Sequence, residues 1–277
     1  MNQYSAPKDP LSRSHVITVQ HLSHKSSISD KPNEDALLVD LDNRIYALAD
    51  GVSRLRGADG MYPNPSPASE VAQLLVTQAS QFIADSVPPI TVRLLEEALR
   101  VAGSSIANYN KEKFPNPDFG INDYAGAVGI VGSIGINTLR YAYIGDCVGL
   151  LVRGGAIRNL TVNQTEGIEA YIRTNKGTPN LEQTIRREIR NNESHPLSWG
   201  VLTGEDKSAA FIKSGELSLN KGDRVVFCSD GLLGVVSRYS ALLAEGSANE
   251  IVNAMLKLED DGSYRSDDKT LILIDIG

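Results

Sequence analysis

Three apolar, β-rich segments of this chain end or break at an aspartate beside a glycine. The segments are "RIYALADGV" (44–52), "LRYAYIGDCVGLLV" (139–152) and "RVVFCSDGLL" (224–233). A single Asp-Gly pair after a strand usually marks a turn, in which glycine supplies the backbone freedom. Because the pattern occurs three times, we expect one common reason for an aspartate at the end of each segment. A cluster of carboxylates at the strand ends would be such a reason.

The predicted strands and helices occur in groups and do not alternate one by one. Apolar residues at helical spacing predict two helices after the first strands. The expected strands are 15–23, 36–41, 44–50, 124–135, 138–146, 148–160, 224–230 and 269–277, and the expected helices are 68–86, 91–113, 181–192 and 248–260. This grouping favours mostly antiparallel sheets with helices packed outside them, which is an α+β fold.

The length of 277 residues is enough to bury one large core. We expect residues 1–13 to form a flexible tail and residues 14–277 to form a single domain. Within that domain, the polar segment 161–199 is expected to be a largely helical insertion.

Composition excludes several classes of protein. The formal net charge of -7 argues against nucleic-acid binding, which needs a concentrated basic face. Only two cysteines, Cys147 and Cys228, are present, so a disulfide framework is not expected and a reducing compartment is favoured. The first residues lack the apolar core of a signal peptide, and no apolar run reaches the roughly 18 residues of a membrane span. We therefore expect a soluble cytoplasmic protein without a nucleic-acid or membrane partner.

The acidic residues near the predicted strand ends are all oxygen donors. They are Glu34, Asp35, Asp50, Asp146, Asp230, Asp267 and Asp268. No Cys or His set accompanies them, so Mg²⁺ or Mn²⁺ suits this chemistry better than zinc. Clustered carboxylates repel one another unless cations lie among them. Two cations that share a carboxylate can activate water for a displacement at phosphorus.

The order of five short motifs resembles a known family. The motifs are "NEDA" (33–36), "ADG" (49–51), "GD" (145–146), "SDGL" (229–232) and "DD-x-T" (267–270). In this order they resemble the metal-dependent protein phosphatases, the PPM or type 2C serine/threonine phosphatases, and specifically a divergent, bacterial-type member. The resemblance runs from about residue 15 to 276. It implies a four-layer α/β/β/α sandwich with the metal site at one end of two central antiparallel sheets.

The resemblance also implies roles for the acidic residues and two or three bound Mg²⁺ or Mn²⁺ ions. Asp50 would bridge two metals, one of which the Gly51 carbonyl would also bind. Asp230 and Asp267 would complete the ligands of the other metal, and these three aspartates form the expected catalytic set. Glu34 and Asp35 would hold metal-bound waters, and Asp146 would bind an additional, weaker metal.

The reaction implied by the resemblance is hydrolysis of phosphoserine or phosphothreonine by a metal-activated bridging water, without a phosphoenzyme. The partners would be a phosphoprotein substrate and a cognate serine/threonine kinase. The segment "HPLSWGVLTG" (195–204) resembles, more loosely, the part of the family that closes a flap. The insertion at 161–199 would then be that flap, suited to substrate selection.

One departure from the family pattern concerns phosphate binding. Many members have an arginine four residues before the first-motif glutamate, and this chain has Asp30 there. Lys31, Arg54 and Arg56 are the candidates to replace it. The charge reversal leaves open an alternative, a catalytically weak or inactive phosphatase-like regulatory or binding domain. A calcium-binding structural module is disfavoured because the chain has no EF-hand loop.

Overall fold

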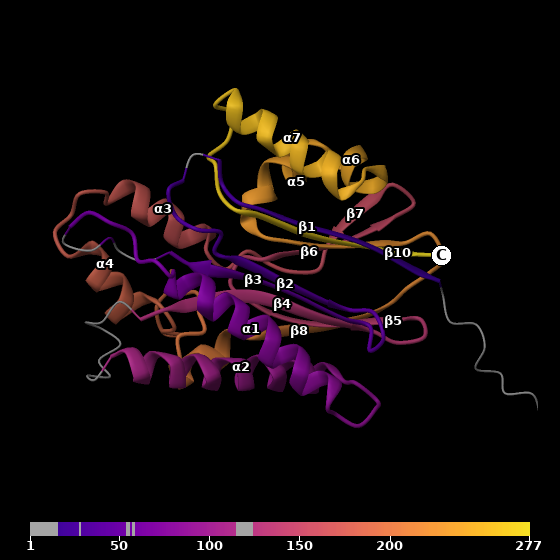
Figure 1. Ribbon diagram of the computed structural model, residues 1–277, viewed down its shortest axis with the longest axis horizontal. Helices are drawn as coiled ribbons and strands as arrows, with labels where there is room; N and C mark the ends of the chain where they lie inside the picture. The colour runs from indigo at the N-terminus through magenta and orange to yellow at the C-terminus, as the bar shows by residue number, and fades with distance from the viewer. Residues whose placement is uncertain (1–15, 28, 54–55, 57–58, 115–123) are drawn as a thin grey trace, which may run out of the picture.

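The computed structural model describes residues 16–27, 29–53, 56, 59–114 and 124–277. Two five-stranded antiparallel sheets lie face to face, with helices outside both (Figure 1). The first sheet has the order β1 (Ile17–His24), β10 (Lys269–Ile276), β9 (Arg224–Cys228), β6 (Val148–Arg153) and β7 (Ala156–Asn159). The second has the order β2 (Asp35–Asp40), β3 (Ile45–Val52), β4 (Gly126–Ile134), β5 (Thr138–Ile144) and β8 (Lys213–Ser218).

Long helices cover the second sheet and shorter ones cover the first. α1 (Pro67–Ala84) and α2 (Val92–Lys113) lie on the second sheet, and their side-chain N-caps are Ser66 and Thr91. The first sheet is covered by α5 (Leu233–Arg238), α6 (Ser240–Glu245) and α7 (Ala248–Asp260). The α/β/β/α sandwich expected from the sequence is thus confirmed.

Side-chain alternation in the central strands builds the three layers of core. In β10, Ile272 and Ile274 pack between the sheets, whereas Leu271 and Leu273 face α5 and α7. Successive side chains in a strand point to opposite faces, so a strand covered on both sides must be apolar throughout. This explains why "LILIDI" reads as an unbroken apolar run with a single acidic residue near its end.

The segment 161–199 contains short helices joined by turns, so it is less helical than predicted. The helices are α3 (Glu166–Thr174), α4 (Leu181–Thr184) and the π-helical turn η1 (Ile185–Ile189). The helix predicted at 181–192 ends at Ile189, because Arg190 has a non-helical ψ of 134° and Asn191 then adopts a positive φ of 55°. Its side chain pairs with the backbone of Val201, donating to the carbonyl at 3.0 Å and accepting from the amide at 2.9 Å. The insertion is thereby anchored to the segment that follows it.

Several short elements differ from the predicted ones. Residues 148–160 form the hairpin β6–β7 and not one strand, because Gly154 and Gly155 adopt φ values of 56° and 80°. Two consecutive residues with positive φ make the tight turn that suits a hairpin. The strand β8, the helices α5 and α6 and the 3₁₀ turns η2 (Asp206–Phe211) and η3 (Asp230–Leu232) were not predicted. They are short, and β8 ("KSGELS") has no alternating apolar pattern.

The first and last described strands are neighbours in one sheet. β1 pairs with β10 along its whole length, from Ile17 opposite Ile276 to His24 opposite Lys269. The predicted tail at 1–13 lies outside the described residues. None of the helices within the described ranges is both long and apolar enough to cross a membrane.

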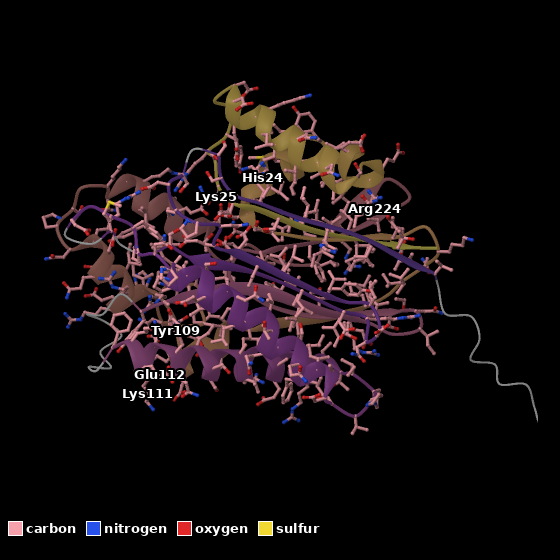
Figure 2. All side chains as sticks on the ribbon, viewed as in Figure 1. His24, Lys25, Tyr109, Lys111, Glu112 and Arg224 are labelled. Carbon is pink, nitrogen blue, oxygen red and sulfur yellow. The ribbon has the colours of Figure 1, made fainter. Side chains whose placement is uncertain are left out.

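An ion pair fixes the end of the sandwich where β9 begins. The Arg224 side chain lies beneath α6 and α7 in Figure 2. Its Nε is 2.6 Å from Asp275 Oδ1, and its Nη1 donates to the Gly246 carbonyl at 2.7 Å. Arg224 therefore ties the connection between α6 and α7 to the first sheet, at the opposite end of β9 from Asp230.

Asn110 should be a main contributor to stability. Its buried side chain donates to the carbonyls of Ala125 and Thr203, at 2.8 and 2.9 Å, and accepts from the Ala125 amide at 3.0 Å. We expect Asn110→Ala to lower the free energy of unfolding by about 2–4 kcal/mol, because it leaves buried backbone groups unpaired. Asn108→Ala, at an exposed position of the same helix, should change it by less than about 0.5 kcal/mol. Urea unfolding of both variants measures this, and equal effects would contradict the assignment.

Candidate metal centre

The predicted acidic residues lie at one end of the sandwich, the end nearest α3 in Figure 1. Asp35 begins β2 directly opposite Asp50 in β3. Asp146 follows β5, Asp230 follows β9, and Asp267 precedes β10. Antiparallel pairing explains the arrangement, since β2 begins where β3 ends and β10 begins where β9 ends.

Five carboxylates at this end influence one another's protonation. Burial raises the pKa of Asp50 well above its ordinary value, and the charges of Asp35, Asp230, Asp146 and Asp267 raise it further. Burial also raises the pKa of Asp230, with Asp146, Asp267 and Asp35 adding to the effect and a hydrogen bond to Asp50 opposing it. The structure therefore brings the five aspartates with expected metal roles close enough for their charges to interact.

Hydroxyl groups orient Asp35. Ser229 Oγ donates to Asp35 Oδ2 at 2.7 Å and accepts from the Thr270 amide at 3.0 Å. Burial raises the pKa of Asp35 to about 7, while hydrogen bonds from Ser229 and Thr270 partly oppose that rise. Neither hydroxyl residue was singled out from the sequence, although Ser229 precedes Asp230 and Thr270 ends the "DD-x-T" motif.

Asp146 links the cluster to the insertion. It follows Gly145, whose φ of 86° turns the chain after β5. The Thr165 hydroxyl lies 3.0 Å from Asp146 Oδ2 and also 3.0 Å from Glu169 Oε1 in α3. Burial raises the pKa of Asp146, which the Thr165 hydrogen bond partly offsets. The start of α3 is thus held next to the carboxylates.

Close backbone packing explains the glycines that follow Asp50 and Asp230. A Cβ on Gly51 would lie 2.4 Å from the Ala68 carbonyl oxygen, and one on Gly231 would lie 1.9 Å from that of Asp268. Real Cβ atoms do not approach oxygen so closely, so only glycine fits at either position without movement. At these two sites glycine is needed because a neighbouring backbone segment lies very close, and not because the residue adopts a positive φ.

Asp268 and Lys269 support the loop that carries Asp267. Asp268 accepts hydrogen bonds from the Ser26 amide at 2.7 Å and the Glu34 amide at 2.8 Å. The fully buried Lys269 ammonium lies 2.6 Å from Glu259 Oε1 and donates to the Asp267 carbonyl at 2.6 Å. Sequence reasoning treated Asp268 only as a neighbour of Asp267 and missed Lys269. The available signal was a lysine at the start of an otherwise apolar final strand.

The Glu34 carboxylate lies in a set of hydrogen bonds at the start of α1. Its Oε1 accepts from the Tyr62 hydroxyl at 2.5 Å and from the Ser66 hydroxyl. Its Oε2 accepts from Ser53 at 2.6 Å and lies 3.7 Å from Lys31 Nζ. Glu34 is not among the charges that act most strongly on Asp50. Its role in holding a metal-bound water stays a prediction.

The three candidate phosphate-binding residues have different surroundings. Arg56 forms a two-point ion pair with Asp30, with Nη–Oδ distances of 2.6 and 2.9 Å. Lys31 Nζ donates to Ser53 Oγ at 2.5 Å. Arg54 lies outside the described residues. The residue that replaces the expected arginine, Asp30, therefore holds one of the candidates in place.

The donor set fits a hard divalent cation in its chemistry. Every grouped side chain is a carboxylate, and Mg²⁺ and Mn²⁺ prefer oxygen ligands. As the side chains stand, no three His, Cys, Asp or Glu residues within the described ranges form a group that could hold a metal ion. Binding of a cation would therefore require these side chains to move from the positions they have here.

Comparison with known proteins identifies the fold. No protein-family model matches the sequence, and no curated protein matches it. Among solved structures, the Mycobacterium tuberculosis serine/threonine phosphatase PstP/Ppp superposes with a TM-score of 0.66 at 22% identity, over 94% of this chain and 98% of that chain. The PstP catalytic domain in complex with 2 manganese ions gives 0.65 at 22% identity, over 94% and 98%.

A third solved structure extends the likeness to another bacterial enzyme. The PPM Ser-Thr phosphatase MsPP from Mycobacterium smegmatis, in complex with cacodylate, gives a TM-score of 0.62 at 18% identity, over 95% of this chain and 100% of that chain. The chain therefore has the fold of the bacterial PPM phosphatases along nearly its whole length, as the five motifs indicated.

The carboxylate cluster predicts how stability depends on pH and metal. Between about pH 4 and pH 7, Asp35 keeps its proton in the folded protein but loses it in the unfolded chain. The unfolded state then binds fewer protons, so stability should fall as the pH rises through this range. We expect the melting temperature in chelator to fall from about pH 5 to about pH 8, and Mn²⁺ to restore it. Asp35→Asn should make the fall less steep, since the other aspartates with raised pKa values remain, and a rising profile would contradict the coupling.

Gly231 offers a test of the close contact beside Asp230. We expect Gly231→Ala to lower the free energy of unfolding by about 1–3 kcal/mol, because the new methyl group overlaps the Asp268 carbonyl. Gly135→Ala is the matched control, since its Cβ would lie no closer than 3.6 Å to another group. Urea unfolding compares the two, and a neutral Gly231→Ala would contradict this account of the motif.

Proposed function

We propose that this protein is a metal-dependent phosphatase that hydrolyses phosphoserine or phosphothreonine in a phosphoprotein substrate. The observation that carries the proposal is the convergence of five aspartates at one end of a PPM-type sandwich. The solved structures with this fold are described as serine/threonine phosphatases, one of them with manganese bound.

Two or three Mg²⁺ or Mn²⁺ ions would be held by Asp50, Asp230, Asp267 and Asp146, with the Gly51 carbonyl as a further donor. When bound, such ions supply an activated water and neutralise charge on the phosphoryl oxygens. The chain's own part is to hold these oxygens in a fixed frame. Ser229 orients Asp35, and Asp268 fixes the loop that precedes Asp35 by accepting a hydrogen bond from the Glu34 amide.

The cysteines do not offer a competing nucleophile. Both Cys147 and Cys228 are buried free thiols near the carboxylates. Burial and the neighbouring aspartates raise the pKa of Cys228 to about 12 and that of Cys147 well above its ordinary value. The reactive form of cysteine is the thiolate, so neither residue suits a phosphocysteine mechanism. Direct attack by water is therefore the better-supported chemistry.

Arg56 is our candidate for the group that grips the substrate phosphate. Asp30 engages its two terminal nitrogens, and the Gly60 carbonyl accepts from Nη1 at 3.1 Å. Tyr62 lies beside it, with the guanidinium carbon 6.0 Å from the ring centroid. Arginine binds phosphate through paired N–H donors, so phosphate would compete with or adjoin Asp30. Lys31, 5.4 Å from the same ring, is the second candidate.

The same ion pair favours one alternative function. If Asp30 keeps Arg56 neutralised when a phosphoprotein arrives, the domain would bind a partner without turnover, as a regulatory module.

We further propose a cytoplasmic signalling role opposite a serine/threonine kinase, in keeping with the two free thiols.

Activity assays test the proposal directly. We expect purified protein to hydrolyse a phosphothreonine peptide and an aryl phosphate with Mn²⁺ or Mg²⁺, and to stop when a chelator is added. Asp50→Asn and Asp230→Asn should each lower kcat/KM at least about 100-fold, because each removes a charged oxygen that the cations need.

Asp42→Asn is the matched control for these substitutions. Asp42 is exposed in the turn between β2 and β3, at the end of those strands away from Asp35 and Asp50. It should keep full activity. Absence of turnover by folded wild-type protein that binds Mn²⁺ would instead favour the regulatory module.

A further inference from the structure

A cleft beside the carboxylates is bordered by two arginines that have no partner among the residues the structure describes. The cleft has a volume of about 600 Å³ and opens between α3, η3 and the connection from α7 to β10. Asp230 and Asp267 lie in its wall, and so do Arg173 of α3 and Arg265. Within the described part of the chain, neither arginine makes a hydrogen bond or an ion pair.

The placement of these two charges is unusual for their surroundings. Arg173 and Arg265 are exposed and come from separate segments, yet both line the same cleft. Most other arginines in the described residues are engaged, as Arg56 is with Asp30 and Arg224 with Asp275. An arginine that borders a cleft and has no internal partner is available to an anionic ligand.

The cleft also has an apolar side. Ile172 is 40% exposed, and Leu233 and Tyr264 are partly buried in the same wall. A lone phosphoryl group would leave this surface and most of the volume unfilled. A peptide segment would fill it, because side chains on both sides of the phosphorylated residue could contact the apolar wall and the arginines.

We propose that this cleft binds the substrate segment that flanks the phosphorylated residue, and that Arg173 and Arg265 select segments with acidic or additional phosphorylated side chains. The inference rests on the proposed phosphatase function and specifies its substrate class. Without these arginines, the aspartates and Glu169 in the cleft would repel an acidic segment. The two guanidinium groups place positive charge beside these carboxylates.

Two phosphopeptides that differ only in their flanking residues test the proposal. One carries Asp and Glu around the phosphothreonine, and the other carries Ser and Gln. The measurement is the ratio of kcat/KM for the acidic peptide to that for the neutral one, in the presence of Mn²⁺. We expect wild-type protein to prefer the acidic peptide and Arg173→Gln plus Arg265→Gln to lower the ratio about 10-fold or more. Arg158→Gln, an exposed arginine in β7, is the matched control and should leave the ratio unchanged.

A binding assay separates this inference from the proposed activity. Labelled peptides with a nonhydrolysable phosphonate in place of the phosphate report affinity by fluorescence anisotropy, whether or not the protein turns over. The double variant should bind the acidic peptide more weakly by a similar factor, mainly through faster release. Arg173→Glu with Arg265→Glu should reverse the preference towards a peptide with Lys and Arg flanks.

The possible results lead to different conclusions. Aryl phosphate turnover without any preference between flanking sequences would leave the phosphatase standing and overturn the role of the cleft. Absence of all turnover, together with arginine-dependent binding of the acidic phosphonate peptide, would overturn the phosphatase and keep the cleft. An equal loss of kcat/KM for both peptides in the double glutamine variant would also overturn the selective role of the two arginines.

Discussion

The hydrogen bonds from two backbone amides to Asp268 connect the halves of the structure on which the site depends. Asp268 precedes β10 in the first sheet, and the amides of Ser26 and Glu34 belong to the loop that leads into the second sheet. A carboxylate that accepts two such bonds holds both backbones at a fixed separation. Ser229 repeats the link by joining Asp35 to the Thr270 amide. The acidic strand ends therefore meet because the sheets are tied at this end.

Much of the fold could be predicted from the sequence because its main elements carry strong periodic patterns. The long helices α1 and α2, the buried strands of both sheets and the grouping of helices outside them all follow from apolar spacing. The shorter elements could not be predicted. β8 is a mostly polar edge strand, and the turn at Gly154 and Gly155 divides what reads as one strand. In each case a few backbone dihedral angles, and not the apolar pattern, decide the structure.

The candidate site, like the fold, could be predicted from the sequence only in part. The aspartates could be located by their position at strand ends, and the structure groups all five. The supporting residues were not predictable, since Ser229 acts through Asp35, which is distant in the chain, and Lys269 through Glu259 in a different element, α7. The pairing of Asp30 with Arg56 is of the same kind. The aspartate that stands where the resemblance implied a phosphate-binding arginine forms, in the folded protein, an ion pair with the guanidinium of Arg56.

The pairing of β1 with β10 has a consequence for how the chain folds as it is made. The first strand of the sandwich forms its ladder with the last one, from Ile17 opposite Ile276 onward. A ribosome releases β1 well before β10, because the two strands lie far apart in the sequence. Contacts between residues so far apart in sequence form slowly, because a long loop must close first. The second sheet with α1 and α2 is assembled largely from earlier residues, so the two halves of the sandwich become complete at different times during translation.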